Sequence, residues 1–454
     1  MRKRTIVWPA LALAAAVPAL GEAAPLKVQP PQIAVREHRL ANGLTVLFHE
    51  DHSVPVVSLQ VWYHVGSKNE RPGRSGFAHL FEHIMFKGSE NLAPGEFTDY
   101  ISSIGGRYNA TTDFDRTLYF EIIPSNHLER LLWMEADRMR ALDVSEANFL
   151  SERDVVKEER RLRVDNPPFG RLFEVVLAST FTTHPYKILS IGSMADLDAA
   201  TIEDVRAFHK LYYVPNNATL VVSGDFDPAQ ALAWIEKYFA PIPKGADIPR
   251  DIPQEPEQTA GRRVVDYDAN TPLPTVLITC HVPEEGDPET YALEVASRIL
   301  SDGQSSRLYR KLVYEQQIAL QAGGQMLALE DPGVFYFYAI LQKGHTAEEG
   351  EASLVAEMIR LQEEPVSAEE LDKAKNQIIA GQVLDRQTTN DKAGAIGHAA
   401  VILGDWRLVD GETARYQKVT AADVQAVARK YFRPENRTVI FMLPEALRPS
   451  EVKP

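Results

Sequence analysis

The 454-residue sequence has one cysteine, few histidines and fewer basic than acidic residues. The single cysteine, Cys280, cannot form an internal disulfide, and the strand-like run 276–279 before it predicts a buried thiol. Lysine and arginine number 48 against 63 aspartates and glutamates, a formal net charge of −15. Such a balance argues against nucleic acid and anionic membrane surfaces as partners.

Long apolar runs are also absent, except at the N-terminus. Residues 1–24 open with basic residues, continue through the apolar run 6–20 and end in small residues, which is the pattern of a secretory signal peptide. A membrane anchor is the alternative, but the run is short for a span and is interrupted by Pro9 and Pro18. The sequence therefore predicts an exported mature chain without a membrane span.

Only 12 histidines are present, and the stretch 76–86 holds two of them four residues apart. On a helix that turns about 100° per residue, His79, Glu82 and His83 project from one side. Apolar residues surround them, and polar groups in such a setting need partners. Zn²⁺ accepts imidazole nitrogens and keeps one position open for a water, which Glu82 would deprotonate as general base. A pair of ordinary helix histidines is the alternative interpretation.

A third metal ligand is expected from a later charged stretch. Glu152 and Glu159 are seven residues apart and so nearly eclipsed on a helix. Val155 and Val156 lie between them, which suggests that both carboxylates point toward the core. The spacing alone fits a solvated charged face equally well.

The irregular alternation of helical and strand patterns favours an α+β fold over a doubly wound parallel sheet. Asn42-Gly43 predicts a hairpin turn, and Ser125 and Ser145 are expected to cap helices. The expected strands are 56–65, 107–112 and 117–123, and the expected helices are 76–86, 94–105, 125–141 and 145–164.

A proline-rich segment divides the chain. Residues 241–257 contain five prolines among charged and polar residues, which prevents regular structure. We therefore expect a signal peptide at 1–24, a metal-bearing domain at 25–240, a linker at 241–257 and a second domain at 258–454.

An internal repeat indicates that the two domains are copies of each other. Residues 201–219 match residues 420–438, and each copy predicts an N-capped helix, a P-x-N turn and an apolar strand. The same offset places Arg298, Ser301 and Asp302 where the first copy has its two histidines and glutamate. Only the first domain is expected to bind the ion.

Together these motifs resemble the pitrilysin/insulinase inverzincin metallopeptidases, in particular the branch with mitochondrial processing peptidase and its bacterial relatives. The resemblance covers nearly the whole mature chain. The residues that carry it are the H-x-x-E-H helix with Gly76 before it and Lys87-Gly88-Ser89 after it, Asn109-Ala110-Thr111, 152–159, His184-Pro185-Tyr186, 213–217 with Gly224-Asp225, and 303–308.

The resemblance implies a zinc endopeptidase with one Zn²⁺ per chain. His79, His83 and Glu159 would bind the zinc. Glu82 would be the general base, and Glu152 would be an acid near His83.

The resemblance also implies how the substrate binds. Asn109 and Ala110 match the edge strand to which the family adds its peptide substrate as a further strand. Backbone hydrogen bonds do not depend on side chains, so broad sequence tolerance is expected.

Members of this family enclose a chamber between two halves, each of two domains, and this chain resembles one half of that clamshell. Each domain is expected to be a mainly antiparallel sheet packed with helices. On the half opposite the zinc, the family carries an Arg and a Tyr that stabilise the transition state. Here those positions are Val313 and Leu320, while Arg307 and Tyr314 repeat the spacing one turn or more upstream. A homologous partner chain that supplies the Arg and Tyr, forming a heterodimer, is therefore implied.

Two functions from different classes remain open. The first is a zinc endopeptidase that hydrolyses peptides or unfolded segments. The second is a zinc-binding or assembly subunit that keeps the fold without turnover. The intact H-x-x-E-H motif favours the first, because a scaffold has no need for a base beside the ion.

Overall fold

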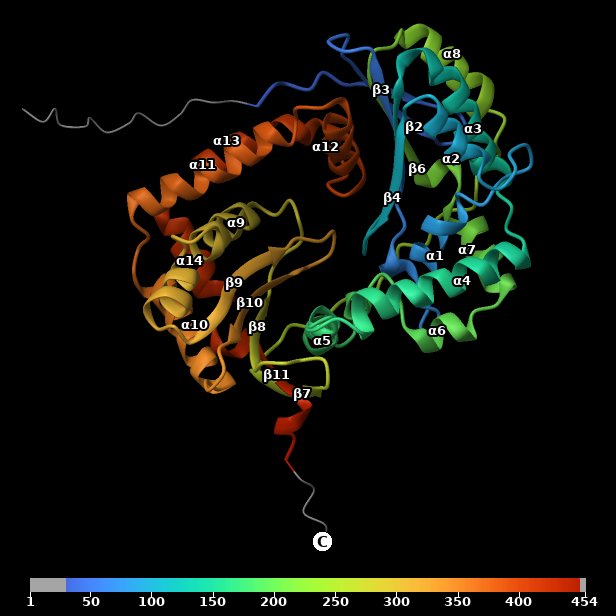
Figure 1. The fold of residues 1–454 in the computed structure, drawn as a ribbon. Coiled ribbons are helices and arrows are strands. Elements are labelled where there is room, and N and C mark those ends of the chain that lie inside the picture. Colours follow the sequence, from blue (N-terminus) through green and yellow to red (C-terminus); the bar gives the residue numbers. More distant parts are fainter. Residues whose placement is uncertain (1–29, 450–454) are drawn as a thin grey trace, which may run out of the picture.

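Each half of the chain is built on one β-sheet, and helices cover the sheets (Figure 1). The computed structural model describes residues 30–449, so the signal peptide expected at 1–24 lies outside the described residues. No helix within 30–449 is both long and apolar enough to cross a membrane. The expected α+β fold is confirmed.

In the described chain, the first sheet has six strands in the order β1-β2-β6-β3-β5-β4, antiparallel except where β2 runs parallel to β6. The strands are β1 (Arg36–Arg39), β2 (Thr45–Glu50), β3 (Val56–Tyr63), β4 (Arg107–Thr112), β5 (Thr117–Pro124) and β6 (Ala218–Gly224). The helices on one face are α1 (Phe77–Ile84), α2 (Glu96–Ser103), α3 (Leu128–Ala141), α4 (Glu146–Arg160), α6 (Met194–Ala199), α7 (Ile202–Tyr212) and α8 (Pro228–Phe239). Their apolar sides and the sheet form one continuous core.

The second sheet has five strands in the described chain, in the order β7-β11-β8-β10-β9, with β7 parallel to β11. The strands are β7 (Arg262–Asp268), β8 (Thr275–His281), β9 (Ala319–Leu327), β10 (Val334–Leu341) and β11 (Arg437–Pro444). The helices that pack with them are α9 (Pro288–Ser301), α10 (Ala347–Glu363), α11 (Ala368–Leu384), α13 (Glu412–Lys418) and α14 (Ala421–Tyr431). The internal repeat is confirmed, because α14 and β11 take the places that α7 and β6 have in the first half. Thr201 and Thr420 cap the two equivalent helices.

One helix from each half also packs on the sheet of the other half. Helix α5 (Leu172–Thr180) packs Val175 and Val176 against Leu277 and Ile440 of the second sheet. Helix α12 (Thr389–Val401) lies on the open face of the first sheet, over β3 and β6. The repeat offset, 420 minus 201, carries residues 172–180 onto 391–399, so α5 and α12 are equivalent elements. The exchange is thus reciprocal.

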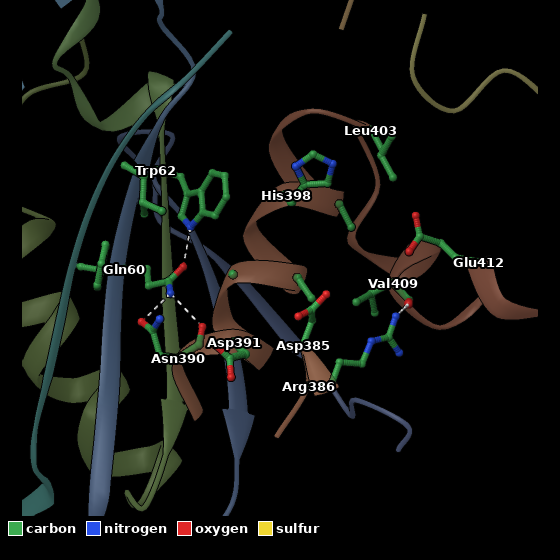
Figure 2. A pocket seen from close by; sticks show the side chains of 15 residues that line it. Gln60, Trp62, Asp385, Arg386, Asn390, Asp391, His398, Leu403, Val409 and Glu412 are labelled. Carbon is green, nitrogen blue, oxygen red and sulfur yellow. Dashed lines mark hydrogen bonds between the residues drawn. The ribbon is translucent and has the colours of Figure 1, made fainter. Parts of the chain in front are cut away.

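Figure 2 shows how α12 docks on β3. The side-chain amide of Gln60 donates to the backbone and side-chain oxygens of Asn390, both at 3.0 Å, and its oxygen accepts from the Trp62 indole at 2.9 Å. Gly397 faces the same indole so closely that a Cβ atom there would lie 2.2 Å from the ring. Beside this contact the helix and the sheet leave a cavity of about 460 Å³, which His398 also lines.

The segment 241–257 has no helix or strand, yet it is fixed to the first half. The Glu255 carboxylate accepts from the backbone N–H of Thr182 and Thr183, each at 2.8 Å. Arg250 donates to the His64 carbonyl oxygen at 3.0 Å. That this segment divides the chain into domains stays a prediction.

Most local expectations agree with the structure. Strand β4 spans the predicted residues, Cys280 is buried in β8, and Ser145 caps α4 by accepting from the Asn148 N–H at 3.4 Å. A short π-helical segment, Arg161–Asp165, continues α4.

Two expectations are wrong. Ser125 caps no helix: residues 125–127 form a 3₁₀ turn, α3 begins at Leu128, and the Ser125 hydroxyl donates to Asp225 at 2.9 Å. Val155 does not point toward the core, because it is 45% exposed whereas Val156 is fully buried. A rotation of about 100° between neighbouring helix residues separates the two valines.

Candidate metal centre and active site

The helix that carries the candidate ligands, α1, begins at a position that only glycine fits well. Gly76 has φ +91°, and a Cβ atom there would lie 2.8 Å from the Ile191 carbonyl oxygen. The Glu70 carboxylate accepts from the backbone N–H of Gly76 and of Ala78, both at 2.8 Å. The first turn is therefore held without a side-chain cap of its own.

Helix α4 packs against α1 and brings Glu159 to both histidines. Glu159 Oε2 lies 3.7 Å from His79 Nε2 and 3.2 Å from His83 Nε2. The imidazole rings are nearly perpendicular, at 86°, with centroids 5.0 Å apart. One ligand atom from each of the three residues lies within 4.8 Å of the other two. Among residues 30–449 this is the one place where three such side chains converge.

The donor set fits a zinc ion. Two imidazole nitrogens and one carboxylate oxygen are a ligand set that catalytic zinc sites use, with a fourth position left for water. Burial, together with the charge of His83, lowers the pKa of His79 to about 4, which favours the neutral imidazole that binds metal. Against the lowering effect of burial, contacts with Glu152 and Glu159 raise the pKa of His83 to about 9, so this imidazole would release a proton when metal binds. Hydrogen bonding to His83 lowers the pKa of Glu159 against the effect of burial, so Glu159 is an anion. The second oxygen of Glu159 contacts Arg163 Nη1 at 2.6 Å, which leaves Oε2 facing the histidines.

Glu152 lies behind His83 rather than among the ligands. Its Oε2 is 3.6 Å from His83 Nδ1, and its Oε1 is 2.8 Å from Lys87 Nζ. Burial raises the pKa of Glu152, but the contacts with His83 and Lys87 outweigh burial and lower it overall. A carboxylate on Nδ1 orients the ring so that Nε2 points to the ion.

We expect Glu152→Gln to lower zinc affinity by about 10–100-fold, because a neutral amide holds the His83 ring less firmly and makes it less basic. Competition against a zinc chelator of known affinity measures the change. The control is Glu158→Gln, since Glu158 is exposed on the same helix and contacts Arg161. Equal zinc affinity in the two variants would contradict this role for Glu152.

Glu82 lies on α1 within reach of the charges of His83 and Glu159. Burial raises its pKa, against the lowering effects of the Thr112 side chain and of His83. A raised pKa brings a carboxylate closer to the range in which a general base works at neutral pH. Thr112 belongs to β4, so the edge strand reaches the candidate base.

Strand β4 has one open edge. Among residues 30–449 it is the last strand of the sheet and pairs only with β5. Next to the turn, the Asp113 N–H donates to the Arg116 carbonyl oxygen at 2.9 Å. Bonded and non-bonded pairs alternate along an antiparallel ladder, so Tyr108, Ala110 and Thr112 turn their backbone N–H and C=O groups outward. Of the two residues that the sequence suggested, Ala110 offers these groups to a peptide. The backbone groups of Asn109 point to β5, and its side chain is exposed.

Comparisons with known proteins decide the family. The model of the insulinase peptidase family M16 matches residues 45–192, and the model described as the M16 peptidase inactive domain matches residues 199–378. The zinc protease PqqE of Helicobacter pylori is 34% identical over 409 residues, which are 89% of this chain and 92% of that protein. The chain belongs to the M16 peptidase family. A crystal structure of a Helicobacter pylori protease covers 91% of this M16 chain and is itself wholly covered, with a TM-score of 0.87 and 32% identity.

A second solved structure is relevant to the expectation that this chain is one half of a clamshell. The periplasmic protease PqqL of Escherichia coli has the same fold, with a TM-score of 0.74 and 19% identity. The match covers 92% of this M16 chain but 48% of that protein. The expected family and the expected half of a two-half architecture are both confirmed.

The residues that repeat the Arg and Tyr spacing do not form a second active-site pair. Arg307 is buried and bound to Glu370, with Nε to Oε1 at 2.7 Å, whereas Tyr314 is 75% exposed. At the positions suggested by the resemblance, Val313 packs against the second core and Leu320 is exposed on β9.

Sequence reasoning missed the residues that hold the candidate ligands. Lys87 and Arg163 contact Glu152 and Glu159, and Thr112 contacts the backbone of α1. Arg163 follows Glu159 by four residues on a helix, a spacing that signals an ion pair. Lys87 and Thr112 come from other elements and carry no such signal.

Proposed function

We propose that this M16 chain is a zinc-dependent endopeptidase that hydrolyses peptides or unfolded segments. The convergence of His79, His83 and Glu159, with Glu82 on the same helix as the two histidines and that helix packed against the edge strand β4, supports the proposal. When bound, zinc would supply a Lewis acid that makes a water molecule more acidic.

The residues of the chain take distinct parts in this reaction. The backbone of Ala110 holds the peptide as an added strand. Glu82 accepts the proton of the attacking water and later returns it to the leaving amine. Glu152 orients His83, and Arg163 keeps Glu159 in place. Binding through backbone hydrogen bonds suits substrates in extended, unfolded form.

Hydrolysis of an internally quenched peptide tests the proposal. We expect activity that a chelator removes and that one equivalent of Zn²⁺ per chain restores. Glu159→Ala should lose both zinc and activity. Hydrolysis that is indifferent to chelator would overturn the proposal, and stoichiometric zinc without turnover under any condition would favour the zinc-binding assembly subunit.

We also propose that the active form is a heterodimer. Among residues 30–449, Arg307 is engaged by Glu370 and the positions suggested by the resemblance are apolar, so a second chain is needed for transition-state donors. The length of PqqL relative to this chain agrees with a missing half.

We expect the purified chain alone to show little hydrolysis and to gain at least about tenfold when a homologous chain carrying the Arg and Tyr is added, because one lost donor to an oxyanion lowers kcat by about 10²–10³-fold. Titration of the partner against a fixed amount of this chain should saturate at one to one. Full activity of the isolated chain, with no change on mixing, would refute the heterodimer.

We propose export to the periplasm on the basis of residues 1–24. Cell fractionation of the full chain and of a chain lacking those residues tests this. Export should depend on the segment.

A further inference from the structure

Within the part of the chain that the structure describes, Arg116 is a half-buried arginine without an acidic ion-pair partner. It lies in the turn between β4 and β5, where its Nη1 donates to the Thr111 carbonyl oxygen at 2.9 Å and also contacts the Thr111 hydroxyl. Its guanidinium carbon is 5.4 Å from the centre of the Trp62 ring. Arg116 forms no ion pair with a carboxylate of residues 30–449, and the carboxylates that act on it from a distance are Asp113, Glu82 and Asp115.

Burial lowers the pKa of Arg116, against the raising effect of those carboxylates. A partly buried charge without a counter-charge gains from pairing with a carboxylate. Within the described chain, the hydrogen bonds that Arg116 donates come only from Nη1. The Nη2 and Nε donors are left for a ligand, and a carboxylate is the group that matches this planar fork.

The strand places Arg116 beside the path of the substrate. Side chains along β4 alternate between the two faces of the sheet, and Thr112 contacts α1. Thr111 therefore faces the opposite side of the sheet, toward α12, where Trp62 and Arg116 lie. A peptide added to the open edge turns the residue opposite Thr111 to this same face, with Cβ atoms about 5 Å apart.

We propose that Arg116 is a specificity-determining residue that binds a carboxylate of the peptide. This inference rests on the proposed peptidase function. The carboxylate belongs either to an acidic side chain opposite Thr111 or to the C-terminus of a peptide that ends there. Because the hydroxyl of the next residue of β4, Thr112, donates to a backbone carbonyl of α1, the helix that carries Glu82, at 3.5 Å, the recognised carboxylate falls close to the bond that is cleaved.

Matched peptides test the proposal in the active protein. Quenched peptides that differ at one position by Glu or Gln, each with a free or an amidated C-terminus, separate the two sources of the carboxylate. We expect kcat/KM to rise by about tenfold or more for one Glu position, or for the free C-terminus, because hydrogen bonds to charged groups are strong. Arg116→Met should remove this preference, and Arg116→Lys should retain part of it.

The control for these variants is Arg107→Met. Arg107 is an exposed arginine on β4, on the same face of the strand as Thr111 and four residues from it. The Arg107→Met variant should keep the Glu-over-Gln preference unchanged. A preference that is the same in wild type and Arg116→Met would overturn the proposal. So would a preference that Arg107→Met removes equally.

A binding measurement separates this inference from the proposed function. The same peptides, labelled at the N-terminus, are titrated against the full chain carrying Glu82→Gln, with and without Arg116→Met, and followed by fluorescence anisotropy. Tighter binding of the Glu or free-acid peptide that depends on Arg116 supports the inference even if the wild-type chain cleaves nothing. Equal affinity for the Glu, Gln, free and amidated peptides, or no binding of any of them, would overturn it.

Discussion

The Glu82→Gln variant is expected to lose hydrolysis by about 10²–10⁴-fold in kcat while keeping its zinc, because glutamine cannot accept a proton. Glutamine has nearly the same shape as glutamate, so the packing around α1 is kept. The fold and the three candidate ligands are left as they are. Single-turnover hydrolysis of a quenched peptide, together with zinc content per chain, measures both parts of the prediction.

Two comparisons make the result specific to the base. Glu158→Gln removes a carboxylate from α4 that is exposed and paired with Arg161, and should change kcat by less than about twofold. His83→Ala removes a candidate ligand and should lose zinc and activity together. Turnover near the wild-type rate in a zinc-loaded Glu82→Gln chain would remove Glu82 from the chemistry.

The candidate ligands on α1 could be predicted from the sequence, because their arrangement depends only on local helical geometry. Two histidines and a glutamate share one side of α1 by helical geometry alone, whatever packs around them. The role of Glu159 is harder to predict from the sequence, because only a contact between α1 and α4 brings this residue to the histidines. The resemblance to a family supplied that contact, whereas spacing alone fitted a solvated helix face equally well. The exposed Val155 shows that the apolar pattern on α4 was a weak guide.

What could not be predicted depends on residues far apart in the chain. The repeat correctly indicated two related halves, but no feature of α5 or α12 signals that each packs on the other half's sheet. An apolar helix face specifies burial and not the partner that buries it. The prediction that Ser125 caps a helix is wrong for a similar reason. The Ser125 hydroxyl donates its hydrogen bond to Asp225, which lies far away in the sequence, and not to the end of a helix.

The exchanged helix gives a second large effect, this time on stability. We expect Gly397→Ala to lower the free energy of unfolding by about 1–3 kcal/mol, because the added Cβ atom would lie 2.2 Å from the Trp62 ring and must push α12 off β3. Helix propensity predicts the opposite sign, since alanine in a helix interior is favoured over glycine by about 0.5–1 kcal/mol. Urea unfolding followed by tryptophan fluorescence measures the sign.

Gly394 on the same helix provides the matched control, because a Cβ atom there meets nothing within 4 Å. Gly394→Ala should therefore stabilise the protein by about 0.5–1 kcal/mol, through propensity alone. The same substitution, three residues apart on α12, is thus expected to act in opposite directions. If both variants are stabilised equally, α12 is not pressed against Trp62, and the hydrogen bonds from Gln60 to Asn390 would then be the main contacts that hold this helix on the first sheet.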